Sequence, residues 1–230
     1  MLEDRLDAKG RLVQAAMRFF AERGIAGVAM HEISAAAGNR NKSAIAYHFN
    51  GRDGLVQAIQ EEFSSFLKPR FDKELGRLEQ SRKDRFSLYE IGLAVNAPFF
   101  ALYASPGGDV ALKTMARLNF EKELGGGLYH DALISIFNRV EALVLLKVPA
   151  KSQGQLKFHL AHYLMATVNG LALTERWTEE DFRDDPDLLL ELMLSYNDYV
   201  TGGLAGTDHQ RPVIDYAYWR DAITYRGAVE

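Results

Sequence analysis

Residues 39–49, which read NRNKSAIAYHF, decide how this chain should fold. The stretch opens with four consecutive polar or basic residues, continues with small side chains, and ends on a tyrosine, a histidine and a phenylalanine. Four polar residues in a row would lose their hydrogen bonds to water inside a protein core. A surface helix is therefore favoured over the alternative, a buried alanine-rich helix in an all-α protein.

Helices are predicted on both sides of this stretch. Apolar residues at helical spacing predict a helix over about 8–23, which Gly24 should end. A short helix is expected over about 30–37, and Gly38 separates it from a third helix over about 42–48. Two short helices joined by a glycine-containing turn, after a longer helix, are typical of a helix-turn-helix. The second helix of that motif enters the major groove of DNA.

The residues of the opening stretch suit such a recognition helix. Ser43, Ala44 and Ala46 are small enough for close approach to base edges, and serine and alanine side chains both make base contacts. Arg40 and Lys42 lie at the helix start, where the helix dipole already favours phosphate. The predicted DNA-contacting residues are Arg40, Asn41, Lys42, Ser43, Ala44, Tyr47, His48 and Arg52.

The remainder of the chain also reads as helix, because apolar residues recur at helical spacing and no strand pattern stands out. Pro69 is expected to end one helix, and Asp185 followed by Pro186 is a typical helix start. Further helices are predicted over about 52–69, 70–80, 84–104, 109–124, 128–147, 152–177 and 186–201. The predicted fold class is therefore all-α.

Three regions are predicted. Residues 1–54 form the helix-turn-helix DNA-binding domain, residues 55–206 a larger helical domain for ligand binding and dimerisation, and residues 207–230 a C-terminal tail. The tail carries four aromatic residues, so we expect it to pack on the body. Charge follows the same division: residues 1–54 carry a net charge of +2, so that with −4 overall the remainder carries −6.

Composition argues against several other classes of protein. The chain has no cysteine, which excludes disulfides and zinc fingers. An acidic, polar N-terminus and the lack of an apolar run of about 18 residues favour a cytoplasmic protein. No phosphate-binding loop or nucleophile elbow is present. His159 and His162 share a helix face, but no third metal-binding residue lies nearby, so they are interpreted as packing residues or contacts to a small molecule. No enzyme activity, metal or cofactor is therefore predicted.

The central helices are rich in aromatic residues and contain a few neutral polar ones, which is typical of a small-molecule pocket. The basic residues Arg117, Arg139 and Lys157 are expected to point to solvent, so the ligand should be apolar or aromatic. The predicted ligand-binding residues are Asn96, Phe100, Tyr103, Phe137, His162, Tyr163 and Asn169.

The helix predicted over about 186–201 is apolar on more than one side. Such a helix must be covered on more than one side, and one of these sides can meet its own domain. The other side needs a partner, which a two-fold helical bundle would supply. We therefore expect a homodimer.

Residues of about 9–60 resemble the N-terminal domain of the TetR family of transcriptional regulators. The resemblance lies in AAMRFFAERGIAGVAMHEISAAAG over residues 15–38, in YHF over 47–49 and in NGRDGL over 50–55. It implies an all-helical protein that dimerises through its C-terminal domain, binds a palindromic operator, and releases it when a small molecule enters the larger domain.

Three features depart from the family pattern. Ala29 stands where a threonine or serine usually caps the second helix, which should cost about 1 kcal/mol. The turn before Tyr47 is one residue longer than in most members. Arg52 replaces the usual phosphate-binding lysine, and an arginine could hold a phosphate through two hydrogen bonds.

These observations favour a ligand-responsive, homodimeric DNA-binding regulator, and a repressor more than an activator. Two alternatives stay open. One is a helical enzyme or carrier with a vestigial helix-turn-helix, and the other is a DNA-binding regulator controlled by a protein partner.

Overall fold

The computed structural model describes residues 7–39, 41, 43–120, 128–148, 153–177, 182–183 and 185–205. Every regular element within these ranges is a helix, which confirms the predicted all-α class. The predictions made for Arg40, for Lys42 and for the tail from 207 to 230 lie outside the described residues.

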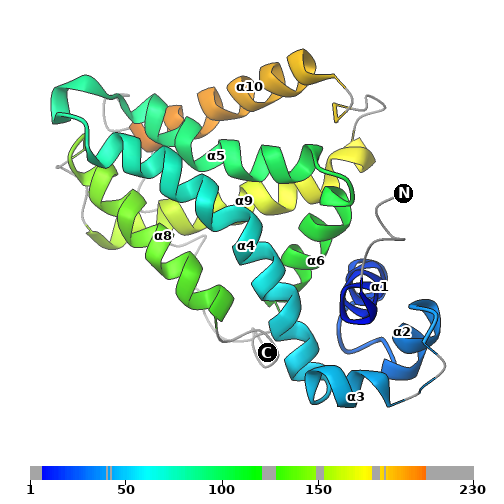
Figure 1. Ribbon diagram of the computed structural model, residues 1–230. Coiled ribbons are helices and arrows are strands. Elements are labelled where there is room, and N and C mark those ends of the chain that lie inside the picture. Colours follow the sequence, from blue (N-terminus) through cyan, green and yellow to red (C-terminus); the bar gives the residue numbers. More distant parts are fainter. Residues whose placement is uncertain are drawn as a thin grey trace, which may run out of the picture.

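A small head is built from α1 (Ala8–Arg23), α2 (Met30–Ala36) and α3 (Ala44–Phe49), which lie together at one end of the molecule (Figure 1). Helix α1 begins where Asp7 accepts a 2.7 Å hydrogen bond from the backbone N–H of Gly10. It ends at Gly24, whose φ of 74° suits a residue without a Cβ atom. These ends agree with the predicted ones, and the apolar faces of the three helices are buried against one another.

Helix α4 (Arg52–Glu79) connects the head to the larger body. It continues through Pro69, so the predicted break at this proline is wrong. Pro69 is exposed, and Leu67 and Phe71 on either side of it are buried, so packing holds the helix together across the lost N–H donor. The Arg70 side chain also donates to the carbonyl oxygen of Phe66 at 2.7 Å, within the turn that the proline disturbs.

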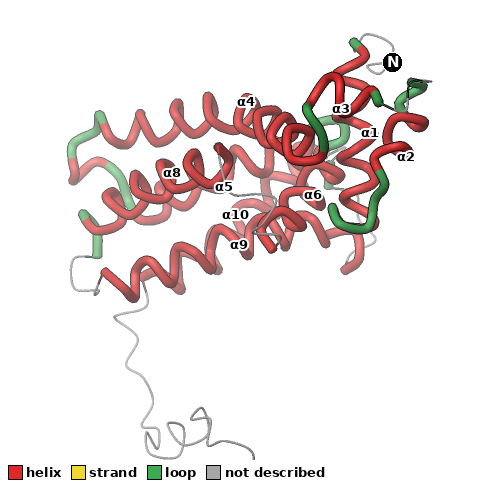
Figure 2. Tube along the Cα trace, turned by 90° about the horizontal axis from the view of Figure 1, so that it is seen from below, coloured by secondary structure: helices red, strands yellow, loops and turns green. Residues whose placement is uncertain are grey.

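Within the described residues, the body contains five more α-helices and one short 3₁₀ segment. Helix α4 packs against α5 and α8, and α5 also packs against α10, with the head at one end of the molecule (Figure 2). Asp185 caps α10 by accepting from the N–H groups of Asp187 and Leu188 at 3.0 and 3.2 Å, as predicted. The elements are η2 (Lys83–Arg85), α5 (Leu88–Ala104), α6 (Gly108–Phe120), α8 (Leu128–Leu145), α9 (Gln153–Trp177) and α10 (Pro186–Ala205). Within the described ranges, no helix is both long and apolar enough to cross a membrane.

A buried polar network joins α5, α9 and α10. The amide of Asn96 donates to the side-chain oxygen of Asn197 at 3.1 Å, and the Tyr163 hydroxyl lies 2.7 Å from the Asn96 side-chain oxygen. Asn197 in turn donates to the carbonyl oxygen of Tyr89 at 3.1 Å. Asn197 comes this close because Gly92 has no side chain: a Cβ atom there would lie 2.2 Å from the Asn197 oxygen.

Arg139 on α8 holds the body end of α4. Its guanidinium makes two hydrogen bonds to Glu79, at 2.7 and 2.9 Å, and one to Asp72 at 2.7 Å. The prediction that Arg139 points to solvent is therefore wrong, because spacing within α8 cannot reveal partners on α4. A hydrogen bond from Lys68, with a further one from Arg139, lowers the pKa of Asp72.

Candidate nucleic-acid interface

Two asparagine side chains shape the loop that leads into α3. The side-chain oxygen of Asn39 accepts from the N–H of Asn41 at 3.0 Å, and that of Asn41 accepts from the N–H of Ser43 at 2.9 Å. Asparagine side chains commonly hold turns in this way. The turn that the sequence marks as one residue longer is thus organised by its own side chains, with Ser43 at the N-cap position of α3.

Helix α3 has one buried face and one exposed face. Ala44, Ile45 and Phe49 are buried in the head, whereas Ser43, Ala46 and Tyr47 are exposed. Ala44 was predicted to approach DNA, but it is only 2% exposed, and its methyl group packs in the core. Ala46, which was also predicted to allow close approach, is exposed.

The exposed end of α3 carries an aromatic pair. Tyr47 is 82% exposed, and its ring stands edge-on to the half-buried His48 at 5.0 Å between centroids. The Lys9 ammonium of α1 lies 5.5 Å from the centre of the Phe49 ring. Lys9 therefore adds a positive charge beside the C-terminal end of α3, which no local sequence pattern could reveal.

Arg52 faces the inside of the head. Its guanidinium donates to the carbonyl oxygen of Val28 at 2.7 Å and also to that of Ile25. It therefore fixes the loop between α1 and α2 to the first turn of α4. These contacts give Arg52 a structural role. The predicted contact with phosphate would have to use the N–H groups of Arg52 that do not bind these carbonyl oxygens.

Glu32 compensates for the missing cap at Ala29. Its carboxylate accepts from the backbone N–H of Ala29 at 2.9 Å and pairs with Arg23 at 3.0 Å. The hydrogen bond from Ala29, with help from Arg23, lowers the pKa of Glu32. Helix α2 is thus held by half of a capping box, in which the glutamate is present and the hydroxyl is not.

A sharp turn joins α3 to α4. Asn50 has a φ of 57° and Gly51 a φ of 106°. Gly54, in the first turn of α4, lies against the end of α3: a Cβ atom there would be 1.7 Å from the carbonyl oxygen of Phe49. Two glycines thus set the angle at which α3 leaves the connecting helix.

The family model of the bacterial regulatory proteins of the tetR family matches residues 12–59, which cover α1 to α3 and the start of α4. The head of this chain therefore matches the N-terminal domain of the TetR family. Solved structures extend the likeness in fold to the body. A TetR-like transcriptional regulator from Rhodococcus sp. RHA1 is 16% identical, with 88% of this chain and 100% of that chain covered and a TM-score of 0.58.

A TetR-family transcriptional regulator from Streptomyces coelicolor is 20% identical, with 86% of this chain and 96% of that chain covered and a TM-score of 0.50. At such identities these likenesses show a shared fold. A search of curated proteins gives no match.

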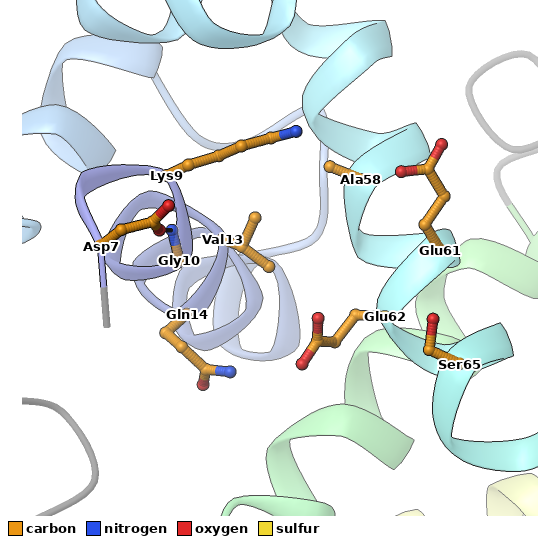
Figure 3. Close-up of a pocket in the computed structure, with 9 residues that line it drawn as sticks. All are labelled: Asp7, Lys9, Gly10, Val13, Gln14, Ala58, Glu61, Glu62 and Ser65. Atoms are coloured by element: carbon orange, nitrogen blue, oxygen red, sulfur yellow. Dashed lines mark hydrogen bonds between the residues drawn. The ribbon is translucent and has the colours of Figure 1, made fainter. Parts of the chain in front are cut away.

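An acidic cleft of about 330 Å³ separates the TetR-family head from the connecting helix (Figure 3). Asp7, Lys9 and Gln14 line it on the α1 side, and Glu61 and Glu62 line it on the α4 side. The two glutamates lie about two to three turns along α4 from its start at α3. Their charges would repel phosphate, which favours an approach of DNA from the α3 side.

The seven residues predicted to bind a ligand do not surround one described cavity. Asn96 and Tyr163 bind each other in the buried network, and Tyr103 is buried as well. Phe100 lines an apolar groove between α5, α9 and α10, whereas Asn169 lines a different cleft, between α1, α6 and α9.

The other two predicted ligand-binding residues lie on other surfaces. Phe137 is half-buried on α8. His162 is exposed on α9 and stacks on Phe158, with 4.1 Å between the ring centroids.

Proposed function

We propose that this TetR-family transcriptional regulator is a ligand-responsive repressor. Two copies would place their α3 helices in successive major grooves of a palindromic operator, about 34–36 Å apart. A small molecule bound to the body would release the DNA, and the protein would work in the cytoplasm, beside its DNA. The observation that carries the DNA-binding part is the division of α3 into a buried apolar face and an exposed face bearing Ser43, Ala46 and Tyr47.

The exposed face supports direct reading of bases. Ser43 can hydrogen-bond several base edges, and the methyl group of Ala46 can contact the methyl group of thymine. Lys9 lies beside α3 and His48 lies on it, and both side chains suit phosphate contacts. The sequence also supports phosphate contacts by Arg40 and Lys42, which precede α3.

Tyr47→Ala is expected to weaken binding to the selected operator about tenfold, because a tyrosine this exposed has its ring and hydroxyl free for DNA. Fluorescence anisotropy, with a DNA fragment selected from a random pool, measures the affinity. Tyr199→Ala is the matched control, since Tyr199 is 78% exposed on α10, far from the head. Equal affinities of both variants and the parent would remove Tyr47 from the interface. The same assay tests the alternative of an enzyme or carrier, which would select no DNA sequence.

A second copy of the chain is the proposed partner of the α9–α10 surface. An apolar groove of about 250 Å³ runs there between Phe100, Gly170, Leu192 and Tyr196. Its lining is almost free of polar surface, and Gly170 leaves room for another helix to approach. Exposed leucines on α9 and α10 continue the apolar surface beyond the groove. An apolar surface of this kind is typical of a site that another protein covers.

Leu192→Glu should convert the dimer into monomer or aggregate, because it places a carboxylate in the apolar groove. Light scattering at micromolar concentration gives the mass, and 25.8 kDa is the mass of a single chain. Leu146→Glu is the control, because Leu146 is also exposed but follows the end of α8. A parent protein that is itself monomeric would contradict the proposed pair of half-sites.

The effector is proposed to be a small molecule with a large apolar or aromatic part. The cleft between α1, α6 and α9 supports this, since four of its seven lining residues are apolar. Thermal-shift measurements against a panel of such molecules would separate this proposal from the alternative, a regulator controlled by a protein partner.

A further inference from the structure

A cleft between α1, α6 and α9 has a volume of about 430 Å³. Helices α1 and α6 lie where the head meets the body (Figure 1). Ala21 of the head lines one side of it. Helix α6 contributes Lys113 and Arg117, which lie one helical turn apart, and α9 contributes Asn169 and Leu173. The cleft is thus formed by three helices, one of which belongs to the DNA-binding head.

Both charged side chains that line this cleft, Lys113 and Arg117, are cations. Lys113 pairs with Asp109 at 3.4 Å, and Arg183 lies 3.5 Å from the other oxygen of the same carboxylate. Asp109 therefore keeps a cationic partner when Lys113 turns toward a ligand. Among the side chains that the structure describes, none that lines the cleft is acidic, so Asp109 beside it is the carboxylate that a bound anion would replace as a partner of Lys113.

Apart from Asn169, the rest of the lining is apolar. It consists of the small side chains of Ala21, Ala116 and Ala172 and the larger one of Leu173. A flat hydrocarbon chain or an aromatic ring could lie on these methyl groups, while one end reaches the two cations and the Asn169 amide.

From this arrangement we propose that the cleft binds a small amphipathic carboxylate, with an apolar body on the alanines and its carboxylate between Lys113 and Arg117. A bare inorganic anion would leave the apolar surface unused, and a neutral molecule would leave the cations unused. The proposal deepens the proposed function by naming the chemical class of the effector, and only its regulatory consequence rests on that function.

The cleft adjoins the contact that ties the head to the body. Thr114 of α6 is buried, and its hydroxyl lies 3.0 Å from the carbonyl oxygen of Met17 in α1 and 2.8 Å from that of Val110. Met17 is one turn before Ala21 on the same helix. A ligand wedged beside Ala21 would therefore push on the α1–α6 interface, and so on the position of the head.

The test uses 4-phenylbutyrate and 4-phenyl-1-butanol as matched probes, with calorimetric titration of the full chain. The acid should bind at least about tenfold more tightly than the alcohol. Lys113→Gln and Arg117→Gln should each weaken the acid about tenfold and leave the alcohol unchanged. Lys157→Gln is the matched control, because Lys157 is exposed on α9 outside the cleft. This variant should bind both probes like the parent.

A second variant tests the location independently of charge. Ala116→Met extends a half-buried side chain into the cleft and should abolish binding of both probes, while thermal unfolding confirms that the variant is folded. Equal affinities for acid and alcohol, or unchanged acid binding in both Gln variants or in Ala116→Met, would overturn the proposal. Acid binding that responds to the variants as expected, without release of the selected DNA, would uphold the anion site and contradict the ligand-responsive function instead.

Discussion

Gly54→Ala should unfold the head or displace α3, and abolish DNA binding. The added Cβ atom would lie 1.7 Å from the Phe49 carbonyl oxygen, and both atoms belong to backbone that cannot rotate away. Relief requires that α3 and α4 separate. Overpacking a buried contact costs roughly 1–3 kcal/mol, and a backbone clash lies at or above the upper end of that range. Urea unfolding followed by circular dichroism measures the stability, and anisotropy measures the affinity for DNA.

Gly76→Ala is the control for this prediction. Gly76 lies in the same helix as Gly54, and nothing is within 4 Å of the position where its Cβ atom would be. Alanine is a better helix former than glycine, so this variant should gain about 0.5–1 kcal/mol and bind DNA like the parent. A Gly54→Ala protein as stable as the parent would show that the α3–α4 angle is not fixed at this contact.

Asn197→Leu should destabilise the body by about 1–3 kcal/mol, because it leaves the buried Asn96 amide without its acceptor. Tyr163→Phe should cost about 1–3 kcal/mol, since the side-chain oxygen of Asn96 loses its donor. Denaturant unfolding measures both. Asn138→Leu on the exposed face of α8 is the control and should change stability by less than about 0.5 kcal/mol. If the two network variants were as stable as this control, water would be satisfying the network.

The same network predicts a loss of stability in alkaline solution. Burial raises the pKa of Tyr163 well above its ordinary value of 10.0. Above that value the unfolded chain releases this proton while the folded chain retains it, so stability falls as pH rises. Comparison of urea midpoints at about pH 8 and about pH 11 should show a smaller decrease for Tyr163→Phe than for the parent.

Local rules predicted the helices well and their partners poorly. Residue types that favour helix ends, such as Gly24 and Asp185, gave correct boundaries because a cap depends on the few residues around it. Pro69 misled for the same reason: the rule that a proline ends a helix ignores packing on both sides of it. Arg52 and Arg139 bind backbone or carboxylate groups 24 to 67 positions away, which no spacing within one helix can reveal.

The candidate site shows the same division. The sequence predicted a short helix at about 42–48, close to α3, but α3 has only six residues, so a small error in its start changes which side chains face outward. Ala44 was predicted on the exposed face and is buried, while Tyr47 was predicted there and is exposed. The predicted ligand residues were chosen by chemistry alone. Neutral polar groups such as Asn96 and Tyr163 are equally suited to bind each other, and only the packing of α5 against α9 decides which occurs.

Because α4 is unbroken, a small tilt of this helix at the body produces a large displacement of its other end, next to α3. Its 28 residues span about 42 Å, at about 1.5 Å for each residue. Arg139 is hydrogen-bonded to α4 near one end, and the turn at Gly51 joins α4 to α3 at the other end. A tilt of about 5° at the body would move the far end by about 4 Å, which is close to the rise of about 3.4 Å between neighbouring base pairs. In a dimer both copies of α4 would tilt, so a change of a few degrees in the body would be enough to move the two heads out of register with two half-sites.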